Sequence, residues 1–457
     1  MNLKDVKYVY FVGIGGIGMS ALVRYFIDLG KKVAGYDKTE TDLTQKLIAE
    51  GAQIHYTDDL NAIPQVFKNK QDTLVIYTPA IPKNHTELYY FTSENFTVLK
   101  RAAVLGLISK AYKTVAVAGT HGKTSISSFT AFLLSNSEVK CSAFLGGIAK
   151  NFNSNFVSNP KSELVVVEAD EFDRSFLHLT PQIALVSATD ADHLDIYGTK
   201  EAVVESFANF VSNVKKGGVA VLKKGIELPK PEGITSYTYA LTEHADFYAS
   251  DITIINGKSF FKLNTPFGNI ENASIYLPGK LNIENAVAAS AMALLAGMSL
   301  EELKIALPKF IGVERRFDIH VQNENILYID DYAHHPEEIR ATLSSIRTNY
   351  SNSKILAVFQ PHLYTRTRDF AQEFGKSLSI ADRVIVTNIY PAREEPIEGV
   401  SSLLITDSIS VPNEICSLEQ VLAKISSYKF DILITMGAGD ISNLVKPISD
   451  FLKNNKK

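Results

Sequence analysis

The stretch VAVAGTHGKT, residues 115–124, is a β-branched strand that runs through a glycine turn into the start of a helix. Such a turn directs backbone N–H groups and a helix N-terminus at phosphate oxygens. Lys123 adds a positive charge there, and the Thr124 hydroxyl is suited to Mg²⁺. The general P-loop pattern would place glycine at Val117, so we predict a tighter variant of that loop. The residues expected to bind phosphates here are Gly119, Thr120, His121, Gly122, Lys123, Thr124 and Ser125.

Acidic residues follow the next two expected strands. In VVVEADEFD, residues 165–173, Glu168 ends a strand where a metal-holding acid is expected beside a P-loop. The acids after it, Asp170, Glu171 and Asp173, fit a solvated loop equally well. TDADHLD, residues 189–195, places His193 among acids after a further strand, which favours a metal role for this histidine.

A second glycine-rich turn lies near the N-terminus. FVGIGGIGMS, residues 11–20, has the G-x-G-x-x-G spacing that receives a pyrophosphate at a helix N-terminus. Dehydrogenases use this spacing for nicotinamide cofactors. Other nucleotides also contain a pyrophosphate, so the loop alone does not show which of them binds. A P-loop in the same chain favours a different nucleotide.

The order of the expected elements predicts an α/β fold. Short apolar runs that end in small or polar residues alternate with helical patterns, as in parallel sheets. Expected strands span residues 8–12, 32–36, 73–77, 114–118, 164–167, 183–187, 326–329, 355–359, 383–387 and 431–435. Between about 217 and 280 the pattern indicates antiparallel strands that decorate a central domain. We place domain boundaries near residues 110 and 312.

Composition narrows the function classes. The 457 residues include 46 Lys and Arg against 50 Asp and Glu, so the net charge of −4 gives no broad surface for nucleic acid or anionic lipid. Cys141 and Cys416 have no metal-ligand spacing and fit a reducing compartment. No signal peptide or membrane-spanning run is apparent, so we expect a cytoplasmic protein.

The C-terminal third carries two further motifs. DDYAHHP, residues 330–336, and FQPHLYTRTRD, residues 359–369, each follow a strand and bring histidine and arginine to its end. Such groups hold a carboxylate or a transferring phosphoryl group. In an alternative interpretation, Arg366 and Arg368 pair with Asp369 or Glu373 on a solvated face.

The motifs in order resemble the Mur ligase family, which makes the peptide of bacterial cell-wall precursors. The set is GIGGIGMS, AGTHGKTS, VEADEFDRSFLHLTP, DADHLD, GVERRF, DDYAHHP, FQPHLYTRTRDF, YPAREEPIEG and GAGDI, and it runs through the whole chain. Within the family, the FQPHLYTRTRDF segment is most similar to members that attach L-alanine. A branch that attaches a preformed tripeptide to the same UDP-sugar is the nearest alternative.

The resemblance implies three domains. These are a Rossmann-like domain at 1–110 that binds a UDP-sugar, a central P-loop ATPase domain at 111–312, and a Rossmann-like ligase domain at 313–457. It implies that ATP phosphorylates the lactyl carboxylate of UDP-N-acetylmuramate, with Mg²⁺ as cofactor. L-Alanine then attacks the acyl phosphate. The alternatives from other classes are a dehydrogenase and a nucleotide-binding regulator without turnover.

The resemblance also implies roles for individual residues. Lys123 would contact the β- and γ-phosphates, Thr124 and Glu168 the first Mg²⁺, and Glu168 with His193 a second. The UDP-sugar residues would be Gly13, Gly15, Gly16, Gly18, Met19, Ser20, Asp37, Thr78 and Ala80. The remaining ATP residues would be Asn282, Asn285, Arg316 and Asp331, and the residues around the amino acid and acyl phosphate would be His335, His362 and Arg366. Two positions depart from the family pattern: Leu281 stands where the family usually has histidine, and Leu363 stands where it often has arginine.

Overall fold

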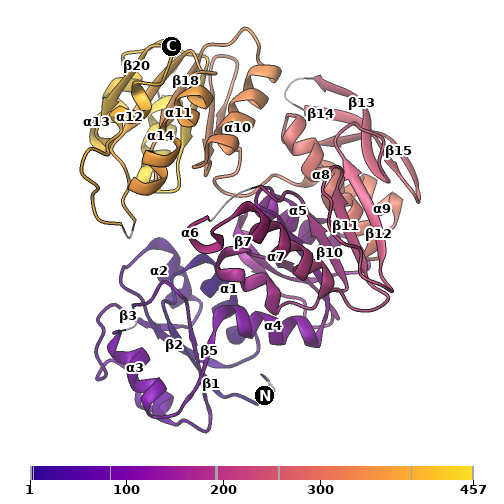
Figure 1. The fold of residues 1–457 in the computed structure, drawn as a ribbon, viewed down its shortest axis with the longest axis vertical. Coiled ribbons are helices and arrows are strands. Elements are labelled where there is room, and N and C mark those ends of the chain that lie inside the picture. The colour runs from indigo at the N-terminus through magenta and orange to yellow at the C-terminus, as the bar shows by residue number, and fades with distance from the viewer. Residues whose placement is uncertain are drawn as a thin grey trace. The chain divides into compact units, whose positions relative to one another are not determined.

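The computed structural model describes residues 3, 5–82, 84–190, 194–255, 258–392 and 394–454, with backbone alone at 194 and 195 (Figure 1). It confirms the α/β fold class with three sheets of five, ten and six strands. The chain divides into two compact units. Unit 1 holds residues 1–251, 261–273 and 284–310, and unit 2 holds residues 252–260, 274–283 and 311–457.

The N-terminal sheet is parallel throughout, in the order β3-β2-β1-β4-β5. Side chains alternate between its two faces. Val9 and Phe11 belong to the apolar cluster that includes helix α1, whereas Tyr10 and Val12 pack in a separate cluster on the other face. The elements are β1 Tyr8–Val12, α1 Ile17–Asp28, β2 Lys32–Tyr36, α2 Asp42–Ala49, β3 Gln53–His55, η1 Gln65–Lys68, β4 Thr73–Tyr77, α3 Thr86–Ser93, β5 Thr97–Lys100 and α4 Arg101–Ala111.

The central sheet has the order β15-β14-β13-β12-β11-β10-β6-β9-β7-β8. Its buried core strands are nearly continuous apolar runs, as expected of strands covered on both faces. The elements up to β11 are β6 Lys113–Ala118, α5 Lys123–Ser135, β7 Ser142–Ala149, β8 Ser154–Val157, β9 Leu164–Glu168, η2 Phe172–His178, β10 Ile183–Val186, α6 Leu194–Tyr197, α7 Lys200–Ser212 and β11 Val219–Lys223.

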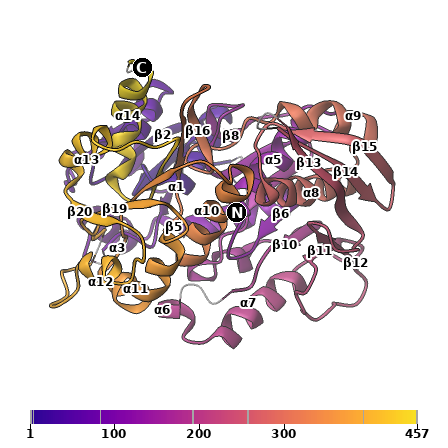
Figure 2. The ribbon, with the colours of Figure 1, turned by 90° about the horizontal axis from the view of Figure 1, so that it is seen from above.

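The strands expected to be antiparallel extend this same sheet. Two residues separate β13 from β14 and β14 from β15, and connections this short join antiparallel strands, as predicted. β11 and β12, in contrast, pair in parallel with their neighbours, and β10, β11 and β12 follow one another in Figure 2. The elements are β12 Thr235–Ala240, β13 Phe247–Ile255, β14 Lys258–Thr265, β15 Gly268–Ile275, α8 Lys280–Leu295, α9 Leu300–Ala306 and η3 Leu307–Lys309.

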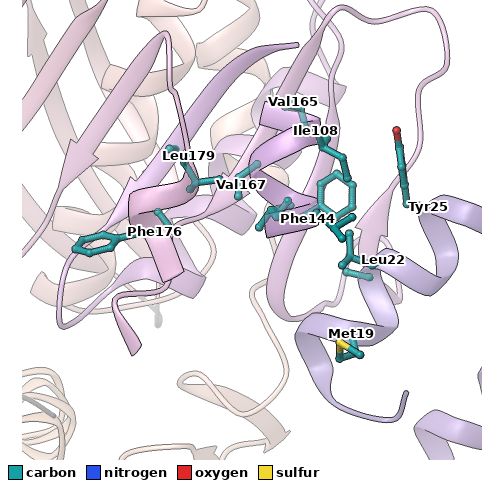
Figure 3. Packing of buried hydrophobic residues seen from close by; sticks show 14 of the residues in the cluster. Met19, Leu22, Tyr25, Ile108, Phe144, Val165, Val167, Phe176 and Leu179 are labelled. Atoms are coloured by element: carbon teal, nitrogen blue, oxygen red, sulfur yellow. The ribbon is translucent and has the colours of Figure 1, made fainter. Parts of the chain in front are cut away.

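One apolar core joins the first two sheets. Tyr25 of α1 lies 5.4 Å from the ring of Phe144 in β7 and 6.1 Å from that of Phe156 in β8. Figure 3 shows Leu22 and Tyr25 of α1 beside Phe144, with Ile108 of α4 close by. The buried Arg24 adds a polar contact, because its guanidinium donates to Asn155 and to Glu50. The helix that begins at the first glycine turn is therefore anchored on the central sheet.

The C-terminal sheet has the order β16-β17-β21-β18-β19-β20, parallel except for β16. Its strands alternate between two apolar clusters: Ile355, Ala357 and Phe359 face α10, α11 and α12, and the intervening Leu356 and Val358 face α13 and α14. The elements are β16 Asp318–Gln322, β17 Leu327–Asp331, α10 Pro336–Asn349, β18 Ile355–Phe359, α11 Tyr364–Leu378, β19 Arg383–Thr387, α12 Leu403–Thr406, β20 Asn413–Cys416, α13 Leu418–Ser426, β21 Ile432–Met436, η4 Asp440–Leu444 and α14 Val445–Asn454.

Candidate functional site

The turn between β6 and α5 has the backbone that a phosphate loop needs. Gly119 and Gly122 have φ of +131° and +81°, values that side-chain-bearing residues rarely adopt. A Cβ at Gly119 would also lie 2.2 Å from the hydroxyl of Ser187. This hydroxyl donates to the carbonyls of Ala118 and His121, so the residue that follows β10 holds the loop in place. The backbone conformation and the close packing both require glycine at 119.

Lys123 lies at the first position of α5 with its ammonium group directed back over the loop. The ammonium donates to the Gly119 carbonyl at 2.7 Å and to the Glu171 carboxylate at 2.8 Å. Burial alone would lower the pKa of Lys123, but the carboxylates of Glu171 and Asp170 outweigh it and raise the pKa. Lys123 is therefore a fixed positive charge at neutral pH.

Glu168 lies at the end of β9 and faces the first turn of α5. Its carboxylate accepts a hydrogen bond from the Thr124 hydroxyl at 2.9 Å and from the backbone N–H of Gly146 at 2.9 Å. A Cβ at Gly146 would lie within 2.2–2.4 Å of this carboxylate, so the glycine of β7 makes room for it. A carboxylate and a hydroxyl side by side are oxygen donors of the type that Mg²⁺ takes, together with water and substrate phosphate.

The third expected metal ligand, His193, lies outside the described residues, as do Ala191 and Asp192. Within the described part of the chain, no group of three or more His, Cys, Asp or Glu side chains is placed to hold a metal. His121 of the loop pairs with Asp190 after β10 at 3.5 Å, and the Thr120 hydroxyl accepts from the Asp190 N–H at 3.2 Å. These contacts tie the phosphate loop to the segment that leads to His193.

For the three acids after Glu168, the sequence left open a role at the site and a solvated loop, and the structure divides the three between these two interpretations. Asp170 and Asp173 are partly exposed and pair with Arg101 and Lys100 at 3.1 and 3.3 Å. Glu171 is only 1% exposed and holds Lys123, so the solvated-loop interpretation is wrong for this residue. Its backbone carbonyl also accepts from the Tyr197 hydroxyl at 2.6 Å. The sequence places Glu171 in one polar run with Asp170 and Asp173, and nothing in that run distinguishes it from them.

The two expected adenine-binding asparagines lie three residues apart on α8, so they share a face of the helix. In unit 1, a Cβ at Gly122 would lie 3.3 Å from the Asn285 side-chain oxygen, which places Asn285 next to the phosphate loop. In unit 2, the Asn282 side chain donates to the Pro278 carbonyl at 2.8 Å.

The first glycine turn is built mostly from backbone. A Cβ at Gly13, where φ is +87°, would lie 2.5 Å from the Thr78 side chain, so β4 closes this side of the turn. Asp37, at the end of β2, accepts from the Gly15 N–H at 2.7 Å. A Cβ at Gly18 would lie 2.7 Å from the Arg101 guanidinium, a residue that sequence analysis did not single out.

The other residues expected to bind the UDP-sugar differ in exposure. Met19 and Ser20 are buried, and the Ser20 hydroxyl donates to the Ile17 carbonyl at 2.8 Å and accepts from Asn155 at 3.0 Å. Both side chains thus contribute to packing of α1, and Figure 3 shows Met19 within the apolar cluster. Gly16 and Ala80 are exposed.

In unit 2, Asp331 is a buried carboxylate at the end of β17. It accepts hydrogen bonds from the N–H groups of Phe317 and Ala333, both at 2.8 Å. Burial raises the pKa of Asp331 to about 6, against the opposing charge of Arg316. Arg316 lies over the Tyr332 ring, 5.0 Å from its centroid. The structure therefore brings together Arg316 and Asp331, the two residues expected to reach the nucleotide from this domain.

Three histidines of unit 2, His334, His335 and His362, follow the ends of strands β17 and β18. The His362 ring stacks on Tyr390 and contacts His334 edge to face, each at 5.8 Å, and the His335 ring lies 5.1 Å from that of Phe370. Burial lowers the pKa of His334, and the nearby Arg366 contributes in the same direction.

The two arginines of the FQPHLYTRTRD motif differ in their surroundings. Arg368 pairs with Asp369 at 2.7 Å on an exposed face, as the alternative interpretation predicted for both arginines. Arg366 has a buried Nη1 with no hydrogen-bond partner among the described residues, so the solvated-face interpretation does not hold for it. Leu363, which departs from the family pattern, caps α11 with a φ of +71°.

Comparison with known families covers the chain in three parts. The Mur ligase family, catalytic domain matches residues 8–113, the Mur ligase middle domain matches residues 117–293, and the Mur ligase, glutamate ligase domain matches residues 315–439.

Individual relatives match over their full length. The UDP-N-acetylmuramate--L-alanine ligase of Parabacteroides distasonis is 50% identical over 99% of this chain and 98% of its own. The enzyme of that name from Phocaeicola vulgatus is 50% identical over all of both chains. The crystal structure of a UDP-N-acetylmuramate-alanine ligase from Thermotoga maritima superimposes with a TM-score of 0.81 at 27% identity, covering 98% of this chain and 100% of that one.

Proposed function

The chain belongs to the Mur ligase family, and we propose that it is an ATP-dependent ligase that joins L-alanine to the lactyl carboxylate of UDP-N-acetylmuramate. The observation that carries this proposal is the 50% identity, over the whole chain, to relatives named for that reaction. Lys123 is hydrogen-bonded to the Gly119 carbonyl and Thr124 to Glu168, so one glycine turn carries the cation and the oxygen donors that the reaction needs.

The proposal assigns one task to each domain. Residues 1–110 bind the UDP-sugar, with its diphosphate at the glycine turn of residues 13–18. Residues 111–312 bind ATP at residues 119–125, with Asn285 beside the loop. Residues 313–457 bind the amino acid through His335, His362 and Arg366, and reach the nucleotide through Arg316 and Asp331.

In the proposed reaction a carboxylate oxygen of the sugar nucleotide attacks the γ-phosphorus of ATP, and ADP leaves. Lys123 neutralises charge on the β- and γ-phosphates as the phosphoryl group moves. The amine of L-alanine then attacks the acyl carbon, the bond from that carbon to the phosphate oxygen breaks, and phosphate leaves as the amine loses a proton. Mg²⁺, held by Thr124, Glu168 and His193, would offset the repulsion between the carboxylate and the γ-phosphate.

Three other functions are weaker. A tripeptide-recycling ligase would share the first two domains, but the relatives at 50% identity carry the L-alanine name. A dehydrogenase would leave Lys123, Thr124 and Glu168 without a use, and a regulator without turnover would not need these three residues together.

No described helix is both long and apolar enough to cross a membrane. We propose the cytoplasm as the site of action because the reaction consumes ATP.

The test is phosphate release from ATP with Mg²⁺ and UDP-N-acetylmuramate. L-Alanine, glycine, L-serine, other amino acids and the tripeptide are added one at a time, and each product is identified by mass. The proposal predicts release and a product one alanyl residue heavier with L-alanine. Release with the tripeptide alone would contradict it in favour of recycling, and no release with any acceptor would favour the regulator.

A further inference from the structure

Arg101 occupies an unusual place for a cation. It begins α4, yet its guanidinium lies at the N-terminus of α1, where a Cβ on Gly18 would come within 2.7 Å of it. Gly18 has no positive φ, so its lack of a side chain serves this close approach and not a special backbone shape. The positive end of a helix dipole disfavours a cation unless an anion lies nearby. Arg101 therefore needs an anionic partner.

Asp170 is the partner that the structure provides. Its carboxylate pairs with the Arg101 guanidinium at 3.1 Å. The other carboxylate oxygen accepts from the Phe172 N–H at 3.1 Å, so the backbone of the acidic loop, residues 169–174, sets the direction of this side chain. A diphosphate at the first glycine turn would offer the same guanidinium more acceptors in a bidentate arrangement.

The acidic loop also holds the lysine of the second glycine turn. Glu171, next to Asp170, pairs with Lys123 at 2.8 Å. One short loop thus carries the anionic partners of two cations, one beside each of the two glycine turns. The sequence of contacts runs from Gly18 to Arg101 and Asp170, then along the backbone to Glu171 and Lys123.

The backbone of the acidic loop is strained. Asp173 and Arg174 have φ of +50° and +55°, so two consecutive residues with side chains adopt the left-handed region. Left-handed residues without a glycine are costly and persist where surrounding contacts hold them. The pairs of Asp170 with Arg101 and of Glu171 with Lys123, both less exposed than the pair of Asp173, are among these contacts. Loss of either pair would allow the loop to relax and would weaken its hold on the other.

We propose that Asp170 and Glu171 are positioning residues that compete with substrate phosphates for Arg101 and Lys123, so that the sugar nucleotide and ATP increase each other's affinity. When the diphosphate binds Arg101, the ion pair of Arg101 with Asp170 breaks and the acidic loop loses one of the contacts that hold it. ATP then displaces Glu171 from Lys123 at a lower cost in free energy, because the loop is already partly released. The effect is reciprocal, as linkage requires. This inference rests on the proposed function, because it needs both ligands.

The test is the affinity for UDP-N-acetylmuramate, measured by calorimetry with and without a non-hydrolysable ATP analogue and Mg²⁺. The parent should bind the sugar nucleotide at least about fivefold more tightly with the analogue present. Asp170→Asn keeps the acceptor for Phe172 and removes the charge that holds Arg101. It should bind the sugar nucleotide more tightly than the parent without the analogue, and the gain from adding the analogue should fall below about twofold.

Asp173→Asn is the matched control, since it removes a charge from the same loop at an exposed pair, and asparagine tolerates a left-handed backbone. It should keep the parental coupling. Glu171→Gln tests the other end: it should bind the ATP analogue more tightly alone and also lose coupling, and it serves if Asp170→Asn does not fold.

Three results would overturn the inference, and they are distinguishable. A parent that binds both ligands without coupling, or an Asp170→Asn variant with parental coupling, would overturn this inference alone. A parent that does not bind UDP-N-acetylmuramate would overturn the proposed function and this inference with it.

Discussion

The two glycine turns of unit 1 look alike in sequence and differ in what surrounds them. Each follows a buried parallel strand and begins a helix, and each uses a glycine at positive φ. The turn at 13–18 has an acid, Asp37, on its Gly15 N–H, and the cation beside Gly18, Arg101, comes from another element. The turn at 119–122 carries Lys123 and Thr124 in its own helix and Glu168 at 2.9 Å from Thr124.

This difference distinguishes a site that binds a phosphate group from a site that transfers one. Backbone N–H groups and a helix N-terminus suffice to bind a diphosphate that does not react. A phosphoryl group in transfer also needs charge that is fixed in place as the transition state forms. On the proposed function, the first turn therefore holds the sugar nucleotide, and the second turn activates ATP.

The largest effect should come from the charge that distinguishes the second turn. Lys123→Ala should lower L-alanine-dependent phosphate release about 10²- to 10³-fold, because the lost cation acts on the moving phosphoryl group. Affinity for UDP-N-acetylmuramate at the first turn should change far less. The control is Lys113→Ala, which removes an exposed lysine from the strand before the loop. A Lys123→Ala variant that keeps most of its kcat would break the comparison.

The carboxylate beside the second turn should affect the requirement for magnesium. Glu168→Gln should raise the Mg²⁺ concentration for half-maximal activity about ten- to hundredfold, because it removes a charged oxygen donor. Titration of activity with Mg²⁺ measures this, with the exposed Glu163→Gln as the control. Superimposable titrations of the parent and Glu168→Gln would contradict the ligand role.

Alanine substitutions at Gly119 of the second turn and Gly16 of the first turn should affect stability differently. Gly119→Ala introduces strain at a φ of +131° and a contact of 2.2 Å to Ser187, so the free energy of unfolding should fall by about 2–4 kcal/mol. Gly16→Ala, where a Cβ meets nothing nearer than 3.7 Å, should leave stability unchanged. Denaturant unfolding of both variants decides this, and equal losses of stability would contradict the different surroundings of Gly119 and Gly16.

The surroundings of the strands that lead into the two turns, β1 and β6, should differ in how their contribution to the free energy of unfolding depends on pH. Tyr10 of β1 donates to the buried Glu87 at 2.7 Å, whereas residues 115–118 of β6 are apolar. Burial raises the pKa of Glu87 to about 7 from 4.5, so the folded state binds more protons than the unfolded state between these values. Its contribution to stability is complete below about pH 4.5 and is lost as pH rises through about 7.

Denaturant unfolding from pH 4.5 to 8 measures this effect as the free energy of unfolding of the parent minus that of Glu87→Gln. This difference should fall as pH rises. Burial lowers the pKa of His55, which lies 3.3 Å from Glu87, from its usual value of about 6.5, so this histidine is neutral in the upper part of the range and does not offset the charge that Glu87 gains there. A difference that does not change with pH would contradict the account.

The strands that lead to the turns could be predicted because they are continuous apolar runs followed by glycine. The sequence predicts strand 8–12 as observed, and the observed 113–118 begins one residue before the prediction. β7 was not predicted, because SAFLGGIA contains two glycines that disfavour a strand. The reason for one of them, Gly146, is the Glu168 carboxylate, which approaches from a neighbouring strand.

The partners of the two phosphate-loop cations could not be predicted from local sequence. Glu171 lies in a polar run that also fits a solvated loop, and its burial results from packing of the acidic loop against α5 and α6. Arg101 follows a lysine at an ordinary helix start, and its contact with Gly18 depends on the order of strands in the sheet. Patterns along the chain place residues at strand ends, but they do not say which of these residues meet.

The measurement that tests the central claim most directly uses UDP-N-acetylmuramate labelled with ¹⁸O in the lactyl carboxylate. The account assigns the sugar nucleotide to the first turn and phosphoryl transfer onto its carboxylate to the second. It therefore predicts that, with L-alanine and Mg²⁺-ATP, the phosphate released carries one ¹⁸O from the carboxylate. Phosphate without the label, released as the product forms, would contradict transfer of the phosphoryl group to the carboxylate.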